Sequence, residues 1–186
     1  MKKIFLAFVV LLTATIVNAQ KNSTDNPTVF SLGVEASVPV GEFNNVADYN
    51  TGIGASAQVA HKVASDITLT LYAGYLKYNQ QGSSTDKYHL TEVPLLAGAK
   101  FWFSPKVYAQ GQLGVAFNSI KYSTISTTVA SATAFAYSPG VGFVLAKNID
   151  VVIKYLGNSM PANSTFSRVT LGSFGARLAY NFLHRK

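Results

Sequence analysis

The chain has 186 residues and a net charge of +7 with neutral histidines, but only 12% of its residues are charged. It contains no cysteine, which excludes disulfides, thiol chemistry and a lipoprotein anchor. Its basic residues form no patch interleaved with aromatic residues and no known nucleic-acid-binding module, so we expect no nucleic-acid partner.

The first residues are typical of a secretory signal peptide. Two lysines supply a basic start, an apolar run follows over residues 4–17, and small residues precede a cleavage site after Ala19. The run is shorter than the ~20 residues that a membrane-spanning helix needs. We therefore predict a signal peptide over residues 1–19 and a short polar tail over residues 20–28.

From residue 29 onward, apolar and polar residues alternate with the period of two that is typical of strands facing two environments. One face collects Val, Leu, Ile, Phe and Ala, and the other collects mainly Gly, Ser, Thr, Gln and Tyr. The eight strands predicted in chain order are 29–39, 52–63, 67–78, 89–103, 107–118, 133–146, 149–156 and 168–182. They make one domain over residues 29–182, with residues 183–186 as a C-terminal tail.

The connections between these strands are alternately short and long. The short ones are 64–66, 104–106 and 147–148, and the long ones are 40–51, 79–88, 119–132 and 157–167. This alternation is typical of a barrel inserted into a membrane from one side. We predict an all-β fold: an eight-stranded antiparallel up-and-down transmembrane β-barrel in the outer membrane, with short periplasmic turns and longer outer loops.

The composition of the two faces indicates which one meets lipid. A soluble exterior usually carries about 25–35% charged residues, and the polar face of this chain carries few. We therefore expect the apolar face to contact lipid and the polar face to line the interior. The interior of an eight-stranded barrel is just wide enough for side chains to fill it, which argues against a wide pore.

Two prolines conflict with regular pairing. Pro94 and Pro139 fall inside predicted strands, where a proline cannot donate to the ladder. A closed barrel has no edge strand to hold them, so we expect a bulge or loosened pairing at each position.

Six charged residues fall on the inward face, where an unpaired charge is costly, so we expect each of them to pair with an opposite charge. We expect Glu35 to pair with Arg177, because closing the barrel brings the first strand beside the last. A gated ion path or a catalytic carboxylate is the alternative to a structural network that plugs the interior, and we favour the plug. The predicted network comprises Glu35, Glu92, Lys100, Asp150, Lys154 and Arg177.

Aromatic residues gather near the predicted strand ends. Membrane barrels place girdles of aromatic side chains at both interfaces with water, although strands favour aromatic residues in general. The predicted girdle comprises Tyr75, Tyr78, Phe101, Trp102, Phe103, Tyr155, Tyr180 and Phe182.

The segments VFSLGVEASVPVGEF, EVPLLAGAKFWFSPKVYAQGQLGVAF, YSPGVGFVLAKNIDVVIKYLG and GARLAYNF together resemble the outer-membrane β-barrel family, the OmpA-like or porin-family eight-stranded barrels of Gram-negative bacteria. The resemblance implies a surface-exposed or adhesive barrel that the barrel-assembly machinery inserts among outer-membrane lipids. It also implies that the outer loops contact a surface ligand. The family's assembly signal usually ends on a terminal aromatic residue, whereas here four residues follow Phe182.

Two other functions are considered. A secreted lipocalin-like barrel would turn the same apolar residues inward around a small apolar ligand. A lipid-modifying barrel enzyme would need a positioned base and nucleophile, and His61 with nearby serines is the one candidate. The histidines at 61, 89 and 184 are too far apart on this layout for a metal site. We therefore expect no catalytic, cofactor or metal site, and no enzyme.

Overall fold

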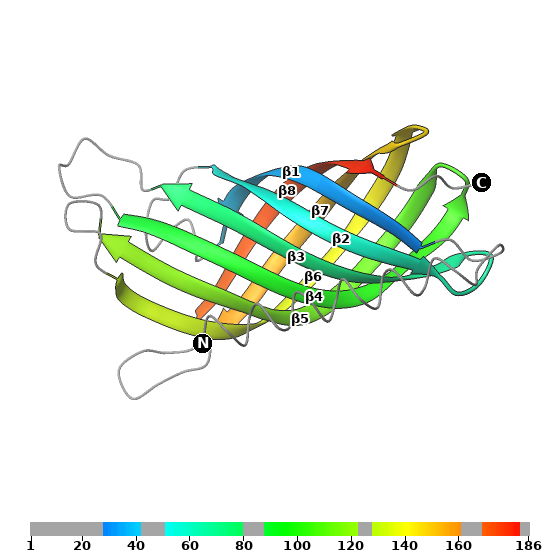
Figure 1. Cartoon of the computed structure of the whole chain (residues 1–186). Coiled ribbons are helices and arrows are strands. Elements are labelled where there is room, and N and C mark those ends of the chain that lie inside the picture. Colours follow the sequence, from blue (N-terminus) through cyan, green and yellow to red (C-terminus); the bar gives the residue numbers. More distant parts are fainter. Residues whose placement is uncertain (1–27, 42–50, 80–87, 123–127, 161–168, 183–186) are drawn as a thin grey trace, which may run out of the picture.

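The structure is a computed structural model that describes residues 28–41, 51–79, 88–122, 128–160 and 169–182 (Figure 1). The predicted signal peptide and the tail after Phe182 lie outside these residues. No helix in the described part of the chain is long and apolar enough to cross a membrane. The strands are β1 (Thr28–Val40), β2 (Gly52–Lys62), β3 (Ile67–Asn79), β4 (Tyr88–Ser104), β5 (Val107–Tyr122), β6 (Thr128–Ala146), β7 (Ile149–Met160) and β8 (Val169–Asn181).

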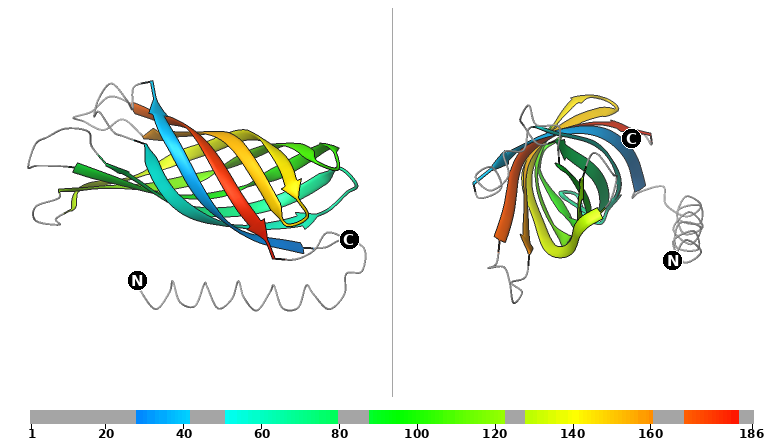
Figure 2. Two further views of the ribbon diagram at one scale, coloured as in Figure 1. Left: turned by 90° about the horizontal axis from the view of Figure 1, so that it is seen from above. Right: turned by 90° about the vertical axis from the view of Figure 1, so that its left-hand side faces the viewer.

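The strands form one closed antiparallel barrel in sequence order. Each strand pairs with its chain neighbours, and β1 pairs with β8 from Ser31↔Asn181 to Val40↔Gly172. The end-on view in Figure 2 shows the strands as a ring around a narrow interior. The connections 63–66, 105–106 and 147–148 lie at one end of the barrel, which we call the turn end. The predicted fold is confirmed.

The two faces of the barrel carry the predicted residues. In β3 every second residue from Thr68 to Tyr78 is buried, and the residues between them are exposed. The same alternation runs around the barrel, so large apolar side chains such as Val34, Ile53 and Leu113 are 62%, 69% and 59% exposed. A continuous apolar exterior of this kind is suited to lipid and not to water. The lipocalin-like alternative is wrong, because it requires these side chains to point inward.

Three strands extend further from the turn end than predicted. The β5–β6 ladder continues to Lys121↔Thr128, so much of the predicted loop 119–132 is strand. In the same way β7 continues to Met160. The alternation fades there because the outward face turns polar, as at Ser119 and Ser131, while the inward Ile120 stays apolar, although the backbone still pairs.

The two prolines loosen pairing without shifting the register. The β3–β4 ladder pairs Ala73 with Leu95 and resumes at Leu76↔Glu92, so pairing lapses at Pro94. The β6–β7 ladder lapses at Pro139 in the same way, and on both sides of each lapse the register is the same. Loosened pairing is therefore confirmed. The register shifts of the described ladders lie elsewhere, near strand ends.

Candidate functional site

The six inward charges come from four strands and are all buried. Glu35 lies on β1, Glu92 and Lys100 on β4, Asp150 and Lys154 on β7, and Arg177 on β8, and none is more than 6% exposed. Three are acidic and three are basic, so their formal charges cancel. The structure brings five of them into one connected group, which we call the charge network: Glu35, Lys100, Asp150, Lys154 and Arg177.

Arg177 lies at the centre of the charge network. It is the direct β-ladder partner of Glu35, and its Nε is 3.7 Å from Glu35 Oε1. Its Nη1 is 4.0 Å from Asp150 Oδ1. The guanidinium also donates to two serines, from Nε to Ser56 Oγ at 2.8 Å and from Nη2 to Ser31 Oγ at 3.0 Å. The pair expected from barrel closure is thus present, and the same arginine links it to a second carboxylate.

Each of these two carboxylates is held by a lysine and a tyrosine. Lys154 Nζ is 2.8 Å from Glu35 Oε2, while the hydroxyl of Tyr72 donates to Glu35 Oε1 at 2.7 Å. Lys154 also donates to that hydroxyl at 2.9 Å, and its ammonium is 4.2 Å from the ring centroid of Tyr72. The three side chains form a closed triangle, in which every charged atom has a polar partner.

The second carboxylate repeats this arrangement. The hydroxyl of Tyr108 donates to Asp150 Oδ2 at 2.7 Å, and Lys100 Nζ is 3.6 Å from the same oxygen. Lys100 donates to the hydroxyl of Tyr108 at 3.2 Å and is 4.3 Å from its ring centroid. Gly142 makes room for this ring, because a Cβ there would overlap it. The charge network is therefore two lysine–tyrosine–carboxylate triangles joined by Arg177.

Sequence reasoning missed the two tyrosines. Tyr72 and Tyr108 lie on the predicted inward face, but only the charged residues were assigned to a network. The available signal was a large side chain with a hydroxyl on a face that is otherwise rich in small residues. Such a side chain reaches far across a narrow interior, and a buried tyrosine hydroxyl usually has a hydrogen-bond partner.

Glu92 lies apart from the charge network, which corrects the expectation that each inward charge has an opposite charge as its partner. Among the described residues Glu92 forms no ion pair, and Asn158 Nδ2 donates to its Oε1 at 2.6 Å. Asn118 in turn donates to Asn158 Oδ1 at 3.4 Å. A neutral amide, and not a cation, therefore contacts this carboxyl group through the bond from Asn158, and Asn118 contacts that amide in turn.

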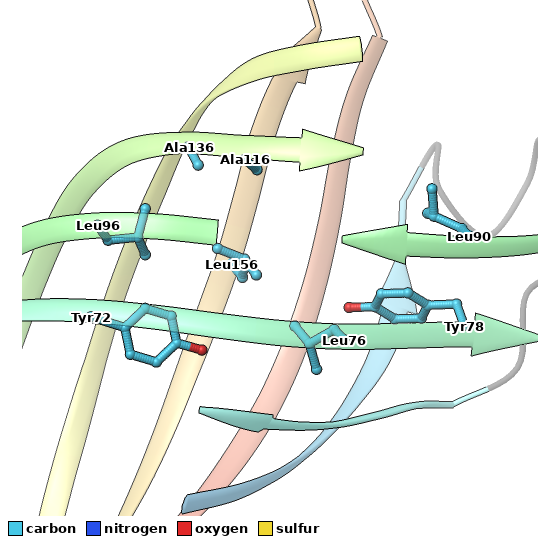
Figure 3. Close-up of a cluster of buried hydrophobic side chains, with 8 residues drawn as sticks. All are labelled: Tyr72, Leu76, Tyr78, Leu90, Leu96, Ala116, Ala136 and Leu156. Atoms are coloured by element: carbon cyan, nitrogen blue, oxygen red, sulfur yellow. The ribbon is translucent and has the colours of Figure 1, made fainter. Parts of the chain in front are cut away.

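The interior also contains an apolar layer, which corrects the expectation of a polar filling. Leu156 lies between Lys154 and Asn158 in the inward series of β7, and Leu76 lies opposite Glu92 in the β3–β4 ladder. The cluster comprises Tyr72, Leu76, Tyr78, Leu90, Leu96, Ala116, Ala136 and Leu156 (Figure 3). These leucines fill part of the inward face beside the charge network.

Comparison with known proteins identifies the family. The outer membrane protein beta-barrel domain family matches residues 7–182. The chain belongs to this family. The family match and the apolar exterior together place the protein in the outer membrane.

The fold is shared with several solved outer-membrane barrels. Ail, the attachment invasion locus protein of Yersinia pestis, was solved in complex with the heparin analogue sucrose octasulfate. It has a TM-score of 0.60 at 18% identity, with 83% of this chain and 97% of Ail covered. Neisserial surface protein A has a TM-score of 0.60 at 12% identity, with 84% and 99% covered. A search of curated proteins finds no match.

Because the barrel lies in the outer membrane, aromatic side chains on its outer face point toward lipid. Six of the eight predicted girdle residues lie on the lipid-facing side: Tyr75, Phe101, Phe103, Tyr155, Tyr180 and Phe182. The other two are corrected. Tyr78 is fully buried in the interior, where its hydroxyl contacts Ser37 Oγ and Ser173 Oγ at 3.1 and 3.3 Å.

Trp102 is the second correction. Its indole Nε1 donates to Thr68 Oγ1 at 3.1 Å, and its ring centroid is 4.5 Å from that of Tyr108. Both partners belong to the inward face, so Trp102 lies inside the turn end of the outer-membrane barrel. Trp102 was assigned to the girdle because it lies beside a turn. The period of two instead places it on the same inward face as Lys100.

The two described histidines of the outer-membrane barrel, His61 and His89, lie near opposite ends of it. His61 is exposed on β2 near the turn end, with its Nδ1 2.9 Å from Thr28 Oγ1. His89 lies near the opposite end of the barrel on β4, and His184 lies outside the described residues. In the part of the chain that the structure describes, no three His, Cys, Asp or Glu residues gather as a metal site would require.

Proposed function

We propose that the protein is a closed outer-membrane barrel that presents its outer loops to ligands outside the cell and does not act as a wide pore. One observation carries the proposal, namely that buried side chains cross the interior at two levels. The charge network spans β1, β3, β4, β5, β7 and β8, and the leucine-rich layer lies beside it. Solute flow through such an interior would require buried ion pairs to separate, at a cost of several kcal/mol.

We assign the surface role to the outer connections, because the strands are constrained by the filled interior on one face and by lipid on the other. The outer connections 42–50, 80–87, 123–127 and 161–168 join strands whose lipid-facing side chains are fixed by the membrane. Sequence in these connections is free to serve recognition, which is where binding residues on rigid scaffolds are commonly found. A related fold, that of Ail, was solved with a heparin analogue, so heparin is the first ligand to try.

Two measurements test the proposal. In a planar lipid bilayer the purified protein should give no steps of the size of a porin channel, and a large, steady conductance would contradict the closed interior. Cells that display the protein should bind to immobilised heparin more strongly than cells that do not. Replacing the outer connections by short Gly-Ser linkers should remove this difference while the heat-modifiable band of the folded barrel persists on a gel. Binding that survives all the replacements would place recognition elsewhere.

A further inference from the structure

A cavity of about 250 Å³ lies inside the turn end of the barrel. Its walls include three lysines, Lys62, Lys100 and Lys147, together with Asp150 and the indole of Trp102. The lysines come from β2, β4 and the turn between β6 and β7. We call it the turn-end cavity. Its lining includes Pro105 and Lys147 of the short turns, so it lies at the periplasmic end of the barrel in this fold.

Strand register explains why the lysines gather there. Lys62 and Lys100 are both ladder partners of Thr68, one from each side. The three residues therefore form one row across β2, β3 and β4, and all three belong to the inward-facing series. Lys147 lies in the turn that leads into Asp150, another residue of the wall. Two separate parts of the barrel thus contribute lysines to the lining of a single cavity.

The charges of the cavity do not balance within the described residues. Asp150 is the one carboxylate of the wall, and Lys100, Tyr108 and Arg177 already contact it. Neither Lys62 nor Lys147 forms an ion pair in the described part of the chain. The wall therefore has a surplus of positive charge beside a partly enclosed space, where water screens charge less than it does on an open surface.

We propose that the turn-end cavity binds a small organic anion from the periplasm, a carboxylate or phosphate carried on a body the size of one sugar. Lys62 and Lys147 hold the anionic group, while Trp102 gives the body a flat aromatic wall. A cavity of about 250 Å³ lies below the range of about 300–1,000 Å³ of sites for drug-sized ligands. This volume suits a single ring with one charged substituent.

The test uses a property of the sequence. Trp102 is the only tryptophan of the chain, so tryptophan fluorescence reports on the cavity wall directly. The folded barrel, in a neutral detergent, is titrated with glucuronate, glucose 6-phosphate and glucose. We expect a saturable change with at least one of the two anions and none with glucose, and the stronger of the two identifies the preferred anionic group. Absence of a saturable change with both anions overturns the proposal.

Two variants distinguish anion binding at the turn-end cavity from a general effect of the protein's positive charge. Lys62→Ala combined with Lys147→Ala should weaken anion binding by at least about tenfold, because charged hydrogen bonds are lost. Lys106→Ala is the matched control, since Lys106 is an exposed lysine of the β4–β5 turn that does not line the cavity. Each variant is first checked for heat-modifiable mobility on a gel. An equal loss of affinity in the control and in the double variant also overturns the proposal.

Discussion

Replacing Arg177 by leucine is the most direct test of the charge network. Arg177 is 1% exposed, contacts both Glu35 and Asp150, and donates to two serines. Removing one partner of a buried ion pair costs about 3–5 kcal/mol. We expect Arg177→Leu to lie near the lower end, at about 3 kcal/mol, because each carboxylate retains a lysine and a tyrosine.

The assay is equilibrium unfolding of the purified barrel by urea in lipid vesicles, followed by the fluorescence of Trp102. Lys106→Leu serves as the control, because it removes a cation from an exposed turn. A double-mutant cycle with Glu35→Gln isolates the contact itself, and we expect a coupling of about 2 kcal/mol. Bilayer conductance is recorded for the same proteins and should stay low, since Leu76, Leu96 and Leu156 still fill the interior.

Two results would refute this reasoning. A loss of stability no greater than that of Lys106→Leu would mean that the ion pairs of Arg177 contribute nothing beyond their desolvation cost. A large increase in conductance, with the fold retained, would mean that Arg177 acts as a gate and that the interior is not permanently closed.

Four further predictions concern neighbouring features. Tyr72→Phe and Tyr108→Phe each remove one 2.7 Å hydrogen bond to a carboxylate and should each lower the free energy of unfolding by about 1.5–3 kcal/mol in the same urea assay. Gly142→Ala should cost about 1–3 kcal/mol because the new Cβ overlaps the ring of Tyr108, and combining it with Tyr108→Ala should remove that cost. Pro139→Val restores a donor where the β6–β7 ladder lapses, and we expect a gain of about 1 kcal/mol in the urea assay, with slower exchange of the neighbouring β6 and β7 amides. Leu113→Arg places a charge on the lipid face and should cost about 2–4 kcal/mol, whereas a value near zero would put Leu113 outside the hydrocarbon region.

The sequence predicted the barrel because lipid and interior impose opposite demands on neighbouring residues. Wherever this contrast exists, as along β3, the alternation is regular and the predicted strand agrees with the structure within one residue. Beyond the membrane the contrast disappears, and the outer ends of β5, β6 and β7 were therefore predicted too short. Pairing of Glu35 with Arg177 was predictable because closure fixes which strands meet.

Other features of the interior depend on how far side chains reach across the barrel. The alternation of apolar and polar residues carries no information about that reach. The alternation alone places Tyr78 on the inward face, but its position near a strand end led us to assign it to the aromatic girdle. The leucine-rich layer was missed for a similar reason, because Leu76 and Leu156 were not included in the apolar face and no role was assigned to them. Contact across the barrel, as between Tyr72 and Lys154, needs the three-dimensional arrangement of strands that are far apart in the chain.

The placement of Arg177 opposite Glu35 has a consequence for how the barrel closes. A slip of β8 by one residue against β1 would turn its apolar side chains inward, and the membrane opposes it strongly. A slip by two residues keeps every side chain on its proper face, so hydrophobicity alone does not distinguish it from the native alignment. Such a slip would place Arg177 opposite Gly33 or Ser37, two positions from its counter-ion. The ion pair between Glu35 and Arg177 thus favours the native alignment of β1 and β8 over a slip by two residues, which contact with lipid does not disfavour.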